Sequence, residues 1–214
     1  MEAVQRLKTP REFWLWVVKF AYLLIAVPVL SCIGVAFFFM ALSESGPLRT
    51  TDFTLSAFAL AGVMVPCGLM MQGVLARRRV LKSITAALRS PNYFWPAEGY
   101  EQYHEGDGKY LGIDTEHGTV LYVHHIRKGQ VDVIALSMND WTNREVDGKT
   151  FRLYTKLPEV PRIEINTPWA QRWFDTLGAM EFKQYSTPLP FAEYVEGHRE
   201  QIQAQLSVRV SQPR

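Results

Sequence analysis

The sequence predicts an α+β protein: a transmembrane helical hairpin followed by an antiparallel β-sheet domain that is capped by C-terminal helices. Three observations predict it. Two long runs, residues 20–43 and 53–76, are apolar and contain no charged residue. Apolar and polar residues then alternate between residues 109 and 166, with the period of β-strands. Residues 167–206 place apolar side chains at the spacing of a helix.

The two apolar runs, within residues 20–76, have the length of membrane spans. Each run has 24 residues, and a helix of that size is about 36 Å long, enough to cross a hydrocarbon core about 30 Å thick. The link, residues 44–52, is short and polar and contains Gly46-Pro47, which suits a turn. A cleaved signal peptide is the alternative for the first run, but that run is longer than usual for such a peptide and a second span follows it.

Small residues and prolines within the runs carry expectations about packing. Pro28 and Pro66 lie near the middles of the spans, where proline favours a kink. Several small residues would allow close helix contact, and are compatible with a homo-oligomer without specifying one: Gly34, Ala57, Ala61, Gly62 and Gly68. We interpret Cys32 and Cys67 as packing residues, because a metal or redox pair would need further ligands nearby.

Basic residues flank the hairpin on one side: Arg6, Lys8, Arg11 and Lys19 before it, and Arg77, Arg78, Arg79 and Lys82 after it. Because positive charge marks the cytoplasmic side of a membrane, both termini are expected in the cytoplasm. Residues 1–19 are then a cytoplasmic tail, either a helix on the membrane surface or a solvated segment.

Residues 77–108 are predicted to join the hairpin to the β domain. Residues 77–89 continue the second helix, and Arg77, Arg78, Arg79 and Lys82 are candidate contacts for lipid headgroups, each worth about 1 kcal/mol near an anionic surface. The alternative is that topology alone explains these charges. Residues 92–108 form an aromatic linker that docks onto the domain or lies at the membrane interface.

Residues 109–206 are predicted to form the β domain. Its strands are expected at residues 109–115, 119–126, 130–138, 151–156 and 162–166, with a hairpin turn at Asp147-Gly148. This is an antiparallel meander with one buried face. Thr167 as N-cap and Pro168 at the first position open a helix, a second helix begins near Phe191, and residues 207–214 form a frayed tail.

The charge of this region argues against nucleic acid as a partner. The whole chain has a formal net charge of +2, but residues 90–214 hold 13 basic and 17 acidic residues. A nucleic-acid footprint requires the opposite balance. The positive charge therefore belongs to the segments that flank the hairpin.

No pattern in the sequence predicts catalysis, a cofactor or a metal site. His124 and His125 are adjacent in a strand and point to opposite faces, so they cannot share a metal ion. A phosphate-binding glycine loop and a nucleophile with a recognisable partner are both missing. Asp140 and Trp141 are candidates for a protein-binding surface, because partly exposed aromatics beside acidic groups suit a partner. Core packing of Trp141 is the alternative.

Two resemblances add to this reading. Residues 109–180 resemble a bacterial pleckstrin-homology-like domain in three stretches: Tyr110–Asp114, the run Val131–Val146 that contains Asn139-Asp140-Trp141, and Trp173–Leu177. That resemblance implies a bent antiparallel sheet capped by a helix.

The whole layout is similar to the entry exclusion proteins of I-type conjugative plasmids, the ExcA family. The similar features are the hairpin from Phe20 to Ala76, the basic stretch Ala76–Arg79, and the stretches Trp173–Met180 and Phe191–His198. This resemblance implies a protein of the recipient cell's inner membrane, which blocks redundant plasmid transfer by recognising a protein of the conjugation machinery. Because catalytic motifs are missing from the sequence, we expect no enzyme activity. The alternative is a membrane-anchored scaffold or a type IV secretion-system subunit.

Overall fold

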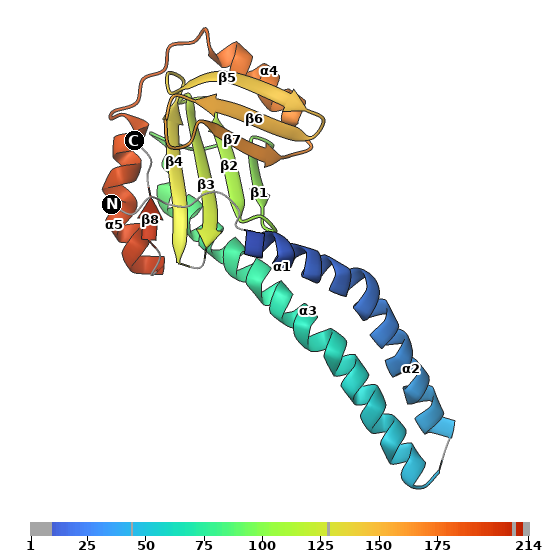
Figure 1. Ribbon diagram of the computed structural model, residues 1–214. Helices are drawn as coiled ribbons and strands as arrows, with labels where there is room; N and C mark the ends of the chain where they lie inside the picture. The colour runs from blue at the N-terminus through green and yellow to red at the C-terminus, as the bar shows by residue number, and fades with distance from the viewer. Residues whose placement is uncertain (1–9, 44, 128, 207–208, 212–214) are drawn as a thin grey trace. The chain divides into compact units, whose positions relative to one another are not determined.

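A computed structural model describes residues 10–43, 45–127, 129–206 and 209–211 of the chain (Figure 1). It divides into two compact units, Met1–Gly73 and Val74–Arg214. The first unit is helical, and the second combines helices with two β-sheets. The chain is therefore α+β, as predicted.

The first unit contains long apolar helices. They are α1 (Pro10–Ala21), a π-helical turn η1 (Tyr22–Ala26), α2 (Val27–Ser43) and α3 (Pro47–Leu88), which continues into the second unit. Two stretches, Val17–Ser43 and Pro47–Leu88, are long and apolar enough to cross a membrane. The predicted tail of residues 1–19 is helical from Pro10, and residues 1–9 lie outside the described residues.

The link between the apolar helices is shorter than predicted. α3 begins at Pro47, so residues 47–52 belong to the helix and not to the link. Proline suits the first position of a helix, because its missing N–H has no acceptor there and its φ is already helical. Gly46, with φ of 84°, makes the turn before it.

A π-helical turn precedes Pro28. Proline cannot donate to the carbonyl one turn earlier, and its ring crowds that carbonyl. The turn Tyr22–Ala26 widens immediately before the proline, which is a recognised form of helix irregularity. The sequence predicts a kink near Pro28, and the structure has a π-helical turn just before it.

The second unit contains a five-stranded and a three-stranded sheet (Figure 1). The first has the order β1 (Glu101–His104), β2 (Lys109–Asp114), β3 (Thr119–Arg127), β4 (Gln130–Ser137), β8 (Arg209–Ser211); the second has β5 (Trp141–Asp147), β6 (Thr150–Thr155), β7 (Arg162–Asn166). Neighbouring strands are antiparallel except β4 and β8, which are parallel. The helices α4 (Ala170–Met180) and α5 (Phe191–Leu206) complete the unit.

The five predicted strands are confirmed, and β5 is the strand that the predicted hairpin turn at Asp147-Gly148 requires before β6. Two further strands, β1 and β8, are additional. β1 lies in the segment predicted as a linker, and Phe94 of the same segment is fully buried. β8 lies in the predicted frayed tail, where Val210 is buried. Both strands are three or four residues long, so they depend on the sheet that they join more than on their own sequence. Residues 207–208 and 212–214 lie outside the described residues.

The five-stranded sheet is buried on both faces, and the prediction of one buried face was wrong for it. Alternate residues of β2, β3 and β4 enter different cores: Leu121 and Val133 pack with α3 and α5, whereas Val120 and Ile134 pack with the three-stranded sheet and α4. Near-continuous apolar strands such as Val131–Leu136 are typical of sheets covered on both sides.

The start of α4 also differs from the prediction. The helix begins at Ala170, and Trp169 occupies the N-cap position without a side-chain hydrogen bond. The Thr167 hydroxyl instead accepts a hydrogen bond of 3.2 Å from the backbone N–H of Trp169, so it stabilises the turn before the helix. The predicted apolar stripe is buried at Trp173, Leu177 and Met180.

Candidate functional site

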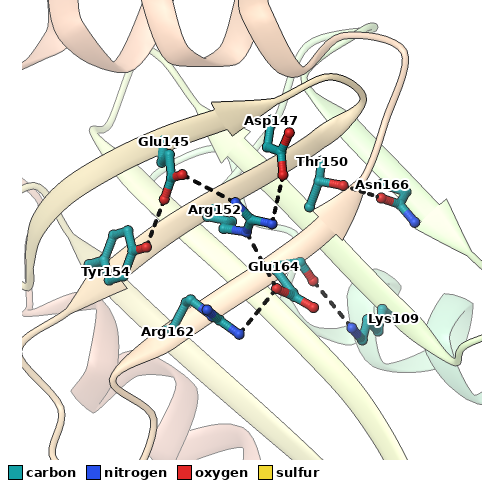
Figure 2. A network of polar contacts seen from close by, with 9 residues as sticks. All are labelled: Lys109, Glu145, Asp147, Thr150, Arg152, Tyr154, Arg162, Glu164 and Asn166. Atoms are coloured by element: carbon teal, nitrogen blue, oxygen red, sulfur yellow. Dashed lines mark hydrogen bonds and ion pairs between the residues drawn. The ribbon is translucent and has the colours of Figure 1, made fainter.

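The outer face of the three-stranded sheet carries a dense set of charged side chains. We call it the polar face, and it consists of Glu145, Asp147, Arg152, Tyr154, Arg162 and Glu164 (Figure 2). The opposite face of the same strands buries Phe151, Leu153, Ile163 and Ile165 in the core. Because successive side chains of a strand point to opposite faces, burial of one set places the other set at the surface.

Strand register aligns three charges of the polar face in one row. Glu145 of β5 pairs with Arg152 of β6, and Arg152 pairs with Glu164 of β7. The guanidinium lies 3.2 Å from the Glu145 carboxylate, 3.7 Å from Glu164 and 3.1 Å from Asp147. Figure 2 shows Arg152 at the centre of these carboxylates. Directly opposed opposite charges stabilise a sheet, so the row holds its side chains in defined positions.

Hydrogen bonds extend the row to both sides. The Tyr154 hydroxyl donates to Glu145 at 2.7 Å, and this bond to a carboxylate raises the pKa of Tyr154. Arg162 approaches Glu164 at 3.5 Å. Lys109 of β2 donates to the Glu164 backbone carbonyl at 3.4 Å (Figure 2). The hydrogen bond from Arg152 to Asp147, with its carboxylate neighbours, raises the pKa of Arg152.

Such a surface is suited to recognition of another protein. Its charged groups are already oriented by one another, so binding orders few further side chains. Arg and Tyr are also enriched among the residues that dominate binding energies. Fixed charges further discriminate between partners, because a like charge brought against them is repelled.

A second polar feature lies between the C-terminal part of α3 and β1. Lys82, Thr85, Ala86 and Arg89 of α3 line a groove of about 360 Å³ together with Glu101 and Tyr103 of β1. We call it the α3–β1 groove. Arg89 forms an ion pair with Glu101, which raises the pKa of Arg89. The hydroxyls of Thr85 and Tyr103 lie 2.8 Å apart, and burial raises the pKa of Tyr103.

The four basic residues predicted to meet lipid headgroups have different surroundings. Arg77 donates a hydrogen bond to the Gly106 carbonyl, and Arg78 forms an ion pair of 2.9 Å with Glu105. Arg79 is exposed and Lys82 lines the α3–β1 groove. The structure brings only one of the four, Lys82, into the groove.

The predicted partner surface at Asp140 and Trp141 does not have the expected exposure. Trp141 is 5 % exposed and belongs to the core between the sheets, so the core-packing alternative describes it. The Asp140 carboxylate accepts hydrogen bonds from the backbone and hydroxyl of Ser137, at 2.7 and 2.6 Å. These bonds close the turn between β4 and β5.

Histidine and carboxylate side chains pair locally. Within the part of the chain that the structure describes, no group of three or more His, Cys, Asp or Glu side chains could hold a metal ion. The buried Asp114 carboxylate lies 2.7 Å from the ring of His117 and also accepts backbone N–H groups of Trp95, Glu116 and His117. Turn formation accounts for the contacts with Glu116 and His117, and the bond from Trp95 holds the preceding segment against the end of β2.

The sequence contained a signal for part of these features. Arg152 and Tyr154 alternate with Phe151 and Leu153 in the sequence, and this period of two placed them on the opposite face of the strand. Residues 101–104 show no such alternation of apolar and polar residues, so β1 had no signal of this kind. The alignment of Glu145 with Glu164 across β6 had no such signal, because it depends on the register of three strands.

Comparison with known proteins gives a match to a protein family. Neither curated proteins nor solved structures provide a significant match, so the resemblance to a pleckstrin-homology-like domain stays a prediction. A family model described as "Exclusion-determining protein" matches residues 2–214. This agrees with the resemblance to entry exclusion proteins and links the chain to entry exclusion in conjugation. The chain belongs to the exclusion-determining protein family.

Proposed function

We propose that this protein acts in the recipient cell, in the bacterial inner membrane, and excludes a related conjugative plasmid by recognising a protein of the conjugation apparatus. The observation that carries the proposal is the family match over residues 2–214. The α+β unit binds the partner without catalysing a reaction, and the apolar helices anchor it with both termini in the cytoplasm.

The membrane anchor is supported by the composition and exposure of the helical unit. Two helical stretches are long and apolar enough to span a bilayer. Large apolar side chains point away from the unit, for example Phe58, which is 78 % exposed. Exposed apolar surface of this extent is costly in water and favourable in lipid. Arg77, Arg78, Arg79 and Lys82 after the second run favour a cytoplasmic position for the α+β unit.

The polar face is the surface that we assign to partner recognition. Its carboxylates on β5 and β7 are held in place by Arg152 of β6. A partner with complementary charges would meet side chains that are already ordered, which favours specific binding. Discrimination between related and unrelated plasmids requires such specificity.

The test is a mating assay with recipients that express the full chain. Transfer of a related I-type plasmid should fall by orders of magnitude, and transfer of an unrelated plasmid should be unchanged. The double variant Glu145→Gln and Glu164→Gln removes two charges of the polar face but keeps oxygen acceptors for Arg152. It should restore transfer of the related plasmid, at unchanged protein level in the membrane fraction.

A matched control removes two charges elsewhere on the same unit. Glu193 and Glu200 are exposed on α5, so the variant Glu193→Gln with Glu200→Gln should exclude as the wild type does. Equal loss in both double variants would contradict a specific role of the polar face. Unchanged transfer with the wild-type chain would contradict exclusion itself and leave the membrane-anchored scaffold as the function to test.

A further inference from the structure

We propose that the α3–β1 groove binds the phosphodiester group of an anionic phospholipid headgroup, with Lys82 as its principal cation. This site is separate from the polar face, and it relies on the proposed membrane location of the protein. The inference starts from how the charges of α3 and β1 are paired.

Charged residues of α3 face the carboxylates of Glu101 in β1 and of Glu105 just after it, in the groove and beside it. Arg78, Lys82 and Arg89 lie on one side of α3, at helical spacings of four and seven residues. On the other side stand Glu105, which pairs with Arg78, and Glu101, which pairs with Arg89. No ion pair joins Lys82 to a carboxylate in the part of the chain that the structure describes. Lys82 therefore contributes a positive charge to the α3–β1 groove that neither Glu101 nor Glu105 neutralises.

Arg89 has further capacity to donate hydrogen bonds. A guanidinium has five N–H donors, and Arg89 uses one of its terminal nitrogens for Glu101. Its Nε is buried without a hydrogen-bond partner among the described residues, so its terminal nitrogens are the donors that remain for a ligand. The Trp95 ring lies 5.9 Å from the guanidinium carbon, a cation–π contact that helps to hold its orientation. Lys82 and Arg89 thus offer a phosphate a free ammonium beside an ordered guanidinium.

The size of the groove suits a headgroup. A volume of about 360 Å³ is at the lower end for sites that bind small molecules. Its lining combines two cations, the hydroxyls of Thr85 and Tyr103, the methyl group of Ala86 and one carboxylate, that of Glu101, which is paired with Arg89. A phosphodiester with a short polar substituent matches this combination of charge and polarity.

The position of Lys82 along α3 favours a lipid as the source of the phosphate. The apolar run of the sequence ends at Ala76, and α3 continues without interruption to Leu88. Six residues of helix correspond to about 9 Å, and a lysine side chain can extend back along the helix toward the headgroups of a bilayer. Lys82 therefore stands at the depth where anionic headgroups are available.

The experiment measures binding of short-chain phosphatidylglycerol to the purified full-length chain in a neutral detergent, for example by native mass spectrometry. Short-chain phosphatidylcholine and inorganic phosphate are the comparison ligands. We expect phosphatidylglycerol to bind, phosphatidylcholine to bind far more weakly, and inorganic phosphate to displace the lipid only in large excess. Lys82→Gln should weaken binding about fivefold, the effect of one basic residue near an anionic headgroup.

Two further variants separate the groove from general positive charge. Arg79→Gln removes an equal charge from an exposed position outside the groove, and should weaken binding less than about twofold. Ala86→Leu fills the groove without changing charge, and should weaken binding as Lys82→Gln does.

If Lys82→Gln and Arg79→Gln weakened phosphatidylglycerol binding equally, the proposed site would be overturned. The lipid would then be attracted by the overall positive charge of the segment and not by the groove. Equal binding of phosphatidylcholine would overturn the role of charge, and displacement by an equal concentration of inorganic phosphate would overturn the lipid as ligand. The binding measurement is independent of plasmid transfer, so failure of exclusion in the mating assay would leave this result standing, and the reverse also holds.

Discussion

The Ser56 hydroxyl of α3 donates a hydrogen bond of 2.8 Å to the backbone carbonyl of Gly34 in α2, and both residues are buried. A second bond of the same kind joins the Tyr22 hydroxyl to the Gly62 carbonyl. The glycines at these points allow the two helix backbones to lie close together. The hydroxyl groups can therefore reach backbone carbonyls of the facing helix. The helical unit is thus held by polar contacts between otherwise apolar helices.

Gly34 should therefore be sensitive to added volume. A Cβ atom at this position would lie 2.9 Å from the side chain of Leu60 and 3.5 Å from the Cβ of Ala59. Gly34→Val should lower the stability of the hairpin by about 1–3 kcal/mol, the usual range for overpacking. Thermal unfolding of the full-length chain in detergent measures it. Gly68→Val is the control, because open space surrounds Gly68; equal destabilisation by both variants would contradict the close contact.

Trp173 should be a major determinant of the stability of the α+β unit. Its side chain is fully buried, and its indole N–H donates to the Gly99 carbonyl at 2.8 Å. Trp173→Phe removes this bond and part of the buried volume, so we expect a loss of about 1–3 kcal/mol.

Chemical denaturation followed by fluorescence would measure the loss in Trp173→Phe. Trp169→Phe makes the same change at a side chain that is 44 % exposed, and should change stability by less than about 0.5 kcal/mol. A larger loss in Trp169→Phe than in Trp173→Phe would be inconsistent with the packing described.

His125 should make the stability of the α+β unit depend on pH. Burial lowers the pKa of His125 below 6.5, and the nearby charge of Arg77 lowers it further. Below pH 6.5 the unfolded chain binds a proton at this residue before the folded chain does. The contribution to stability is therefore complete above this pH and declines as pH falls toward the folded-state pKa.

The measurement compares the wild type with His125→Gln between about pH 7.5 and about pH 5.5, by thermal unfolding. The wild type should lose more stability over this interval than the variant, which cannot titrate at position 125. Parallel pH profiles for the two proteins would show that His125 does not contribute the dependence.

Val210 should attach the C-terminal strand to the sheet. It is 5 % exposed, pairs with Val131 of β4 and packs in the core beside α5. Val210→Asp would bury an unpaired charge, and we expect β8 to detach or the unit to lose about 2–4 kcal/mol.

Hydrogen exchange of the backbone amides of β4 would detect this change, with faster exchange around Val131 in the variant. Arg209→Asp is the control, because Arg209 is exposed on the same strand. Unchanged exchange in Val210→Asp would mean that β8 does not protect the edge of β4.

Local patterns in the sequence were enough to predict part of the architecture. Uncharged apolar runs predicted the two long helices, and alternation predicted β2, β3, β4, β6 and β7 within a few residues. The Asp147-Gly148 turn joins β5 and β6, with φ of 59° at Gly148. Each of these features depends on residues close together in the sequence. The period of apolar side chains predicts helices and strands, and the positive φ open to glycine predicts the turn.

Contacts between residues far apart in the sequence depend on how the elements pack in three dimensions. β1 and β8 are too short to be recognised alone, and they form because β2 and β4 offer an edge to pair with. Trp141 was a candidate for a binding surface, with core packing as the alternative, and it lies in the core between its own sheet and the five-stranded sheet. The row Glu145–Arg152–Glu164 and the opening beside Lys82 arise from strand register and from the docking of α3 against β1. These are contacts between distant parts of the chain, and no local pattern encodes them.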